Sequence, residues 1–160
     1  ENLTLEQLRG ICTGEITNWA QVGGEDREIE LYARHKLTTP SDILEMALNC
    51  TITAQVSKLR MVFPYFMFDY TDVQYRNTRG AIGFALKSEM GEEYAKTKAI
   101  AIEGVLPEDE NITDGSYPIC DGIYMATNAA RGENVQQFIS WVTGSQGQEI
   151  AQKCGFAPIN

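Results

Sequence analysis

The sequence predicts a layered α/β domain, because helical and strand-like segments alternate along most of its 160 residues. A capping-box pair, Thr4 and Gln7, marks the start of a first helix. Residues 28–34 alternate apolar and polar side chains, which is the pattern of a half-buried strand. The predicted order of elements is α, β, α, β, α, β, β, α, without an internal repeat or a linker. One domain is therefore expected over residues 1–160.

The N-terminal part of the chain is predicted to hold a helix, a loop and the alternating strand. The helix covers residues 5–12 and ends at Thr13-Gly14. Trp19 is expected to fill the core beneath a loop that closes at Gly23-Gly24. The core-facing side chains of the strand are Ile29, Leu31 and Ala33, and the opposite face has Glu30, Tyr32 and Arg34.

A second helix is predicted directly after this strand. Thr39 is expected at its N-cap and Pro40 at its first position, because the first turn of a helix accepts proline. Asp42 completes a box-like start. The predicted apolar stripe of this helix consists of Ile43, Met46, Ala47 and Cys50.

The remainder of the chain is predicted to contain three strands and three helical segments. The strands are expected at residues 81–86, 99–103 and 123–127, and the helices at 89–96, 135–142 and 148–153. The aromatic-rich segment 61–70 is interpreted as core filling or a covered loop. Residues 103–121 contain six acidic residues and neither Lys nor Arg, so a solvated loop is expected there.

The composition excludes several classes of function. The chain has 22 acidic and 13 basic residues, a net charge of -9, and therefore lacks the basic surface of a nucleic-acid-binding protein. No run reaches the roughly 18 apolar residues of a membrane helix. The chain opens on a polar, helix-starting stretch instead of a signal peptide, so a processed or excised chain is expected.

The residue types that most often carry chemistry form no recognisable catalytic or metal pattern. Cys12, Cys50, Cys120 and Cys154 allow three disulfide pairings, and the alternative is free thiols packed as small hydrophobes. A single histidine and the absence of a CxxC motif give no zinc pattern. No nucleophile stands at a recognisable spacing from a base. We therefore expect neither an enzyme nor a cofactor.

The best candidate for a binding site is the turn between the strand at residues 28–34 and the next helix. In open α/β sheets, ligands bind beyond the carboxyl ends of strands, where helix N-termini supply N–H donors and a positive dipole. Thr38 and Thr39 add hydroxyls, Arg34 adds a charge-assisted contact, and His35 lies in the same basic run. This pattern indicates a small oxyanion. In the structural alternative, Arg34 pairs with a carboxylate and Thr39 only caps its helix.

Four blocks of the sequence closely resemble bacterial phosphate-binding proteins, the solute receptors of ATP-driven phosphate importers. They follow one another in the order of that family and together cover most of the chain. The blocks are LTLEQLRGICTGEITNWAQVGG (3–24), GAIGF (80–84), EGVLPEDENITDGSYPI (103–119) and FISWVTGSQGQEIAQKCGFAPI (138–159). The resemblance implies a three-layer lobe of the type II periplasmic-binding-protein-like fold with a mixed central sheet.

The resemblance also implies a role for the candidate site. In this family an Arg ends the strand and a Ser-Gly-Thr triplet opens the helix, and their hydroxyls and amides hold the anion. Arg34 matches that Arg, whereas this chain has Thr38-Thr39-Pro40 at the triplet. Thr39 replaces the Gly that permits close backbone approach, and Pro40 removes both a hydroxyl and an N–H. A weakened or altered site for phosphate or a similar oxyanion is therefore expected.

By the same resemblance, the chain corresponds to the second lobe of the family with its C-terminal helices, and the first lobe is absent. A full-length relative would bind its anion between two lobes in an extracellular or periplasmic location, and pass it to a membrane permease. The rival hypothesis is a non-transporting extracellular interaction module that keeps the scaffold but has lost anion binding.

The C-terminal helices raise a question of packing. In the family, the helices corresponding to residues 138–153 pack partly against the first lobe. Their apolar stripe must then cover the present lobe, exchange into a partner, or stay exposed. We expect a compact single domain with some tendency to form a homodimer.

Overall fold

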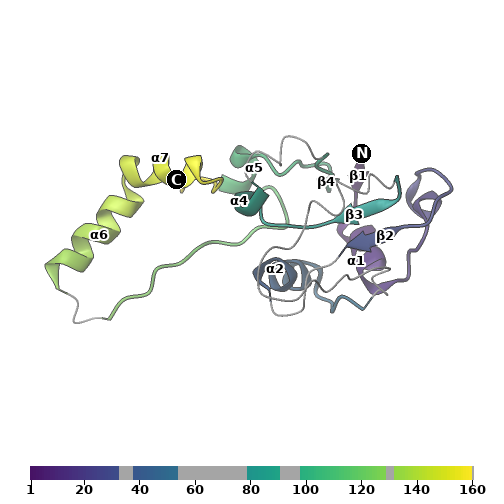
Figure 1. Ribbon diagram of the computed structural model, residues 1–160, viewed down its shortest axis with the longest axis horizontal. Coiled ribbons are helices and arrows are strands. Elements are labelled where there is room, and N and C mark those ends of the chain that lie inside the picture. The colour runs from purple at the N-terminus through teal and green to yellow at the C-terminus, as the bar shows by residue number, and fades with distance from the viewer. Residues whose placement is uncertain (33–37, 54–78, 91–97, 129–131, 160) are drawn as a thin grey trace.

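The computed structural model describes residues 1–32, 38–53, 79–90, 98–128 and 132–159. Arg34, His35, the aromatic-rich segment 61–70 and most of the helix predicted at 89–96 lie outside this set. In chain order the described elements are β1 (Asn2–Leu3), α1 (Leu5–Thr13), the 3-10 helix η1 (Trp19–Val22), β2 (Glu30–Tyr32), α2 (Thr39–Leu48), β3 (Ala81–Gly83), α4 (Lys87–Met90), β4 (Ala101–Ile102), α5 (Asp109–Thr113), α6 (Glu133–Thr143) and α7 (Ser145–Lys153) (Figure 1).

The main body of the molecule, which we call the lobe, consists of the described residues between 1 and 119. Its strands form two parallel pairs, β1 with β4 and β2 with β3. Parallel pairing joins strands that are distant in the sequence, so a crossover connects the members of each pair. Antiparallel pairing in the described part of the chain is limited to two isolated bridges, Asn18 with Glu28 and Ile102 with Val105.

One hydrophobic core joins the two strand pairs to α1 and α2. These two helices contact each other, and each directs its apolar side chains toward the strands. The buried core residues are Leu3, Leu8, Ile11, Cys12, Ile29, Leu31, Leu44, Leu48, Ile52, Ile82 and Ile102. Helices and parallel strands therefore share one core, as the predicted α/β class requires.

The predicted first helix is confirmed, together with both of its end signals. The Gln7 amide donates to Thr4 Oγ1, and the Thr4 amide donates to Gln7 Oε1, both at 3.0 Å. The helix ends at Gly14, whose φ of 82° is the left-handed value that glycine adopts without strain. Glu103, directly after β4, accepts a hydrogen bond from the Leu5 amide at 2.6 Å. This contact connects the N-terminus of α1 to the end of β4, the strand that pairs with β1.

The second helix begins one residue earlier than the sequence suggested. Thr38, not Thr39, is the N-cap, because Thr38 is extended whereas Thr39 is already helical. The predicted apolar stripe is also wrong at Met46, which is 75% exposed. Leu44 and Leu48, one turn apart, face the core instead. The helix has several apolar residues, so two apolar stripes were possible. The stripe that contains Leu44 and Leu48 is the one that packs in the core with the strands.

The neighbouring strand β2 begins two residues later than predicted, and its described residues are buried on both faces. Tyr32 was expected on a solvent-facing side, yet it is buried together with Leu31. β2 lies beside β3 in a parallel pair, and strands in such pairs are commonly covered on both sides. The strands predicted at 81–86 and 99–103 are present as the shorter β3 and β4.

Two predictions for the second half of the chain are wrong. Within the predicted loop at residues 103–121, residues 109–113 form α5, whose acidic first turn suits the positive end of a helix. The predicted strand at residues 123–127 is exposed and belongs to no sheet among the described elements. A strand is defined by its pairing, so an alternating apolar pattern is insufficient when no neighbouring strand is present.

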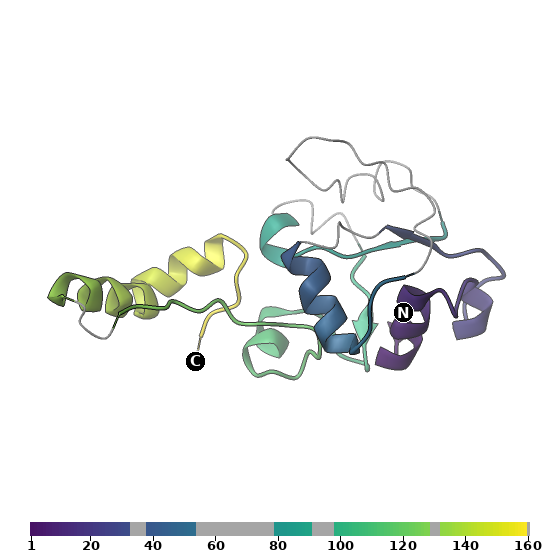
Figure 2. The ribbon, with the colours of Figure 1, turned by 90° about the horizontal axis from the view of Figure 1, so that it is seen from below.

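Residues 121–159 form a second region, which we call the arm. From the lobe, residues 121–128 extend to α6, and α7 then returns toward the lobe (Figures 1 and 2). α6 and α7 contact each other, and the tail is attached by a hydrogen bond from Thr113 Oγ1 to the Pro158 carbonyl at 3.0 Å. Both helices were predicted. Of the three alternatives for their apolar stripe, exposure is the one found in the structure.

Candidate functional site

The candidate binding turn lies where β2 ends and α2 begins. Of its four predicted residues, Thr38 and Thr39 are described, and Arg34 and His35 are outside the described residues. Thr38 is half-buried and Thr39 is exposed at the first turn of α2. The structure therefore puts two hydroxyls at a helix N-terminus beyond the carboxyl end of a parallel strand, which is the usual ligand side of such a sheet.

The hydroxyl of Thr38 is directed to a neighbouring side chain. It makes no capping hydrogen bond to the amides of α2, and it lies 3.1 Å from Ser41 Oγ. Ser41 is 1% exposed, the only buried polar side chain of the described core. Sequence reasoning missed Ser41. A Ser three residues after an N-cap Thr, at the helix spacing that brings side chains together, was the available signal.

Two features of the first turn of α2 limit what it offers an anion. Pro40 has no N–H, so this turn has one amide donor fewer than a turn built from other residues. Asp42 adds a carboxylate in the same turn, which suits the helix dipole but repels a bound anion. Both features weaken the described part of the turn as a site for an oxyanion, and a nearby cation would offset them.

An apolar cavity of about 1110 Å³ borders this turn and extends between the two strand pairs. Thr39 lies on its wall, together with core residues such as Leu31 and Ile82. The cavity wall also contains two lysines, and both have carboxylate partners. Lys98 Nζ lies 2.6 Å from Glu1 Oε1, and Lys87 pairs with Asp109. Among the described residues of the wall, no lysine is thus left without an ion-pair partner.

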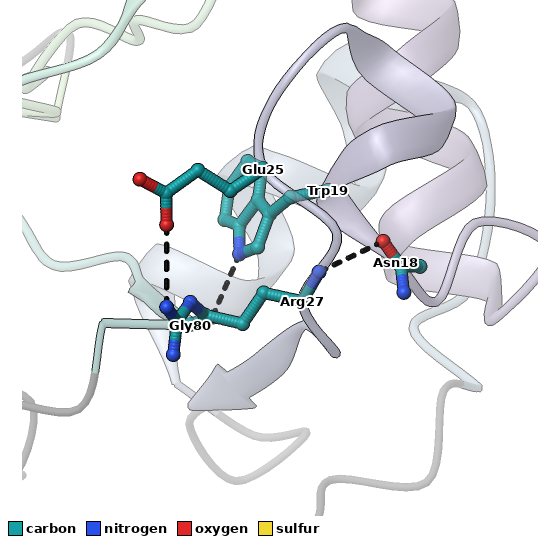
Figure 3. Close-up of polar contacts among 5 residues, drawn as sticks. All are labelled: Asn18, Trp19, Glu25, Arg27 and Gly80. Atoms are coloured by element: carbon teal, nitrogen blue, oxygen red, sulfur yellow. Dashed lines mark hydrogen bonds and ion pairs between the residues drawn. The ribbon is translucent and has the colours of Figure 1, made fainter.

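A polar cluster around Trp19 holds the loop before β2 against the start of β3 (Figure 3). The indole Nε1 of Trp19 donates to the Gly80 carbonyl at 3.0 Å, and the Arg27 amide donates to Asn18 Oδ1 at 3.1 Å. Trp19 packs partly buried against the core, as predicted. The Arg27 guanidinium lies 3.2 Å from a Glu25 carboxylate oxygen at the surface. These contacts hold the β2–β3 pair together. Their polar groups bind one another, so their role is structural.

The cysteines are free thiols in the structure, so of the two alternatives the unbridged one is present. Burial, with smaller contributions from the neighbouring Cys50 and Glu45, raises the pKa of Cys12 to about 12. Burial likewise raises the pKa of Cys50, against a smaller opposing effect of Arg9. A thiol with a raised pKa is a poor nucleophile at neutral pH. Among the described residues, His, Cys, Asp and Glu side chains do not gather into a group able to hold a metal ion.

Comparison with known proteins identifies the family. Residues 1–146 match the PBP superfamily domain. This chain belongs to the PBP superfamily. The family membership agrees with the resemblance found in the sequence. Each described helix is too short or too polar to span a membrane.

Its similar curated relatives are two phosphate-binding proteins named PstS. The protein from Borreliella burgdorferi is 29% identical over 168 residues, a match that covers 99% of this chain and 58% of the relative. The protein from Bacillus subtilis is 26% identical over 164 residues and is covered to 51%. The chain therefore spans little more than half the length of these relatives.

Solved structures give the same result at the level of the fold. The crystal structure of PstS from Borrelia burgdorferi has a TM-score of 0.71 and 26% sequence identity, with 99% of this chain and 64% of that chain covered. A Clostridium perfringens structure, described as a putative phosphate ABC transporter substrate-binding protein with bound phosphate, has a TM-score of 0.72 at 23% identity and is covered to 63%. The α/β fold class of a PBP-like lobe is thereby confirmed.

Proposed function

We propose that this chain is the phosphate-binding lobe of a solute-binding protein that serves an ABC transporter. The observation that carries the proposal is the match of nearly the whole chain to two PstS phosphate-binding proteins. The position of the Thr38-Thr39 turn beyond the end of β2 supports it, because this is where α/β sheets bind anions. Relatives with this role are binding proteins, so we propose a transport function and no catalysis.

In the proposed site, Arg34 supplies the cation and Thr38 and Thr39 supply hydroxyl donors, with His35 beside them. The need for Arg34 follows from the surroundings: Lys87 and Lys98 on the cavity wall are paired with carboxylates, and Asp42 brings a further negative charge. An arginine can bind phosphate through two parallel hydrogen bonds, which makes it a strong partner for this anion.

We propose that the affinity of this site is low. Pro40 provides neither N–H nor hydroxyl, and the Cβ of Thr39 keeps a ligand away from the backbone. Each missing donor costs roughly 1–3 kcal/mol when an anion oxygen is left unpaired. Two such losses weaken binding by about a hundredfold to ten-thousandfold. In a longer protein, a second lobe would add donors and exclude water, and the receptor would work outside the cytoplasmic membrane with a permease.

A second candidate function is a non-transporting interaction module. The Thr38-Thr39-Pro40 sequence favours it, because this segment still begins a helix but offers an anion fewer hydrogen-bond donors. In this alternative the α/β scaffold is retained for contact with another protein. The two functions differ in one measurable property, which is saturable binding of phosphate.

The test is isothermal titration of the purified chain with phosphate, with sulfate as the competing oxyanion. We expect saturable binding in the micromolar range for phosphate, weakened at least tenfold by Arg34→Ala because the charge-assisted bonds are lost. Arg27→Ala is the matched control, since it removes the same charge at the other end of β2, where Arg27 pairs with Glu25. Absence of phosphate binding, or equal losses in both variants, would favour the interaction module.

A further inference from the structure

The hydroxyl at the start of α2 does not do what a threonine ordinarily does at that position. Thr38 is the N-cap, where a threonine side chain usually accepts a hydrogen bond from an amide of the first turn. The Thr38 side chain makes no such bond, and its Oγ1 lies 3.1 Å from Ser41 Oγ. The N-cap hydroxyl is therefore paired with a side chain of the first turn instead of with the amides of that turn.

Helix α1 provides the ordinary arrangement for comparison. Its N-cap, Thr4, accepts a hydrogen bond from the Gln7 amide, and the Gln7 side chain accepts one from the Thr4 amide, both at 3.0 Å. Both helices follow an extended threonine, and the third helical residue is Gln7 in α1 and Ser41 in α2. Thr4 and Thr38 thus have equivalent places in their helices but different hydrogen bonds, which points to a different role for Thr38.

Ser41 connects the buried core to the edge of the candidate site. It is 1% exposed, whereas Thr38 is half-buried beyond the end of β2. A hydroxyl at this depth needs partners within the protein, because burying it without hydrogen bonds is costly. The packing of α2 on the core holds Ser41 in place, so a hydrogen bond from Ser41 also restricts the orientation of the Thr38 hydroxyl.

The chemistry of two paired hydroxyls makes this contact relevant to an anion. A hydroxyl has one proton to donate and two lone pairs that accept. Either oxygen of the Thr38–Ser41 pair can be the donor. When Ser41 donates to Thr38, the proton of Thr38 can be donated to an oxyanion. Accepting a hydrogen bond also makes a hydroxyl a stronger donor, because the two bonds polarise each other.

We propose that Ser41 is a positioning residue for the anion site: it donates a hydrogen bond to Thr38 Oγ1 and thereby directs the Thr38 proton to a bound phosphate. This inference rests on the proposed phosphate-binding function and adds a residue to its site. Ser41 does not touch the anion. It partly offsets the lack of a hydroxyl and an N–H at Pro40, because it improves Thr38 as a donor.

Isothermal titration of the full chain with phosphate tests this role through a double-mutant cycle. Ser41→Ala should raise the phosphate dissociation constant about threefold to tenfold, because Thr38 becomes a weaker and less well oriented donor. Thr38→Ala should raise it about tenfold to a hundredfold, since a hydrogen bond to a charged group is lost. In the Thr38→Ala background, Ser41→Ala should have no further effect, because Ser41 acts through Thr38.

Two further variants separate positioning from packing and capping. Ser41→Cys keeps a side chain of similar shape, but a thiol is a weak donor, so this variant should weaken binding as Ser41→Ala does. Thr4→Ala is the matched control, because it removes an N-cap hydroxyl that does cap its helix. It should lower the melting temperature and leave the phosphate dissociation constant unchanged. Thermal unfolding followed by circular dichroism verifies that each variant is folded at the temperature of the titration.

Three results would overturn the inference, and they differ in what they leave standing. Unchanged affinity in Ser41→Ala, while Thr38→Ala weakens binding, would leave the proposed function intact. An equal loss from Ser41→Ala in the wild type and in the Thr38→Ala background would mean that Ser41 acts by another route. A wild type that binds no phosphate would overturn the proposed function together with this role.

Discussion

The lobe and the arm contain helices of similar amphipathic character, yet only the lobe buries them. In the lobe, α2 directs Leu44 and Leu48 into a core shared with the strands. In the arm, Phe138 and Trp141 lie on an exposed side of α6. Among the described elements, α7 is the one that makes extensive contacts with α6. The comparison teaches that a helical apolar stripe predicts a helix, whereas the partner that covers the stripe must be established separately.

The two regions should differ most in their response to the loss of a large side chain. Ile11 is 2% exposed, so Ile11→Ala should lower the free energy of unfolding by about 2–5 kcal/mol through lost burial and a cavity. Phe138→Ala, measured at a concentration where the chain is monomeric, should change it by less than about 0.5 kcal/mol. Urea unfolding followed by circular dichroism measures both values. Equal destabilisation would mean that the arm packs on the lobe in solution.

A glycine in the arm should show an intermediate effect that is confined to that region. A Cβ at Gly147 would overlap the carbonyl oxygens of Val142 and Trp141, which belong to the backbone and cannot rotate away. Gly147→Ala should therefore destabilise the α6–α7 pair by about 1–3 kcal/mol, despite the better helix propensity of alanine.

Hydrogen exchange resolved by segment locates this effect. Faster exchange in residues 133–153, with the amides of α1 unchanged, is the expected result. Gln152→Ala is the control, because Gln152 is exposed within α7 and alanine is a good helix former. Faster exchange throughout the lobe after Gly147→Ala would contradict the separation of the two regions.

The local signals in the sequence predicted the parts of the fold that depend on neighbouring residues. The capping box of Thr4 and Gln7 and the stop at Gly14 are short-range signals, and the structure has both. The alternation at residues 28–34 likewise predicted β2. Helix α5 was missed because the many acidic residues near it suggested a solvated loop, although acidic residues are also typical of a first helical turn.

The errors concern features that depend on distant residues. Burial of Tyr32 depends on the pairing of β2 with β3, whose residues lie about 50 positions later in the chain. The segment 123–127 has the pattern of a strand but lacks a paired neighbour among the described elements. At the candidate site, Thr38 and Thr39 were predicted, whereas Ser41 was missed because its burial follows from the packing of α2 on the core. The roles of Arg34 and His35 remain predictions.

The cysteines provide the most sensitive comparison between the regions. Cys12 is buried in the lobe, and burial raises its pKa from the ordinary value of 9.0 to about 12. Between these values the unfolded chain has lost the thiol proton while the folded chain retains it. The contribution to stability is therefore complete below pH 9 and declines as the pH rises toward 12, by about 1.4 kcal/mol for each pH unit.

Unfolding titrations of the wild type and of Cys12→Ala at a series of alkaline pH values measure this contribution. Other groups also titrate in this range, so the expected signal is the difference between the two slopes, with the wild type steeper. A thiol-reactive reagent gives an independent result at neutral pH. Cys154, exposed on the arm, should react in the folded chain, whereas Cys12 should react only after unfolding. Labelling of Cys12 in the folded chain as rapid as that of Cys154 would contradict its burial. It would mean that the core of the lobe opens readily in the native state.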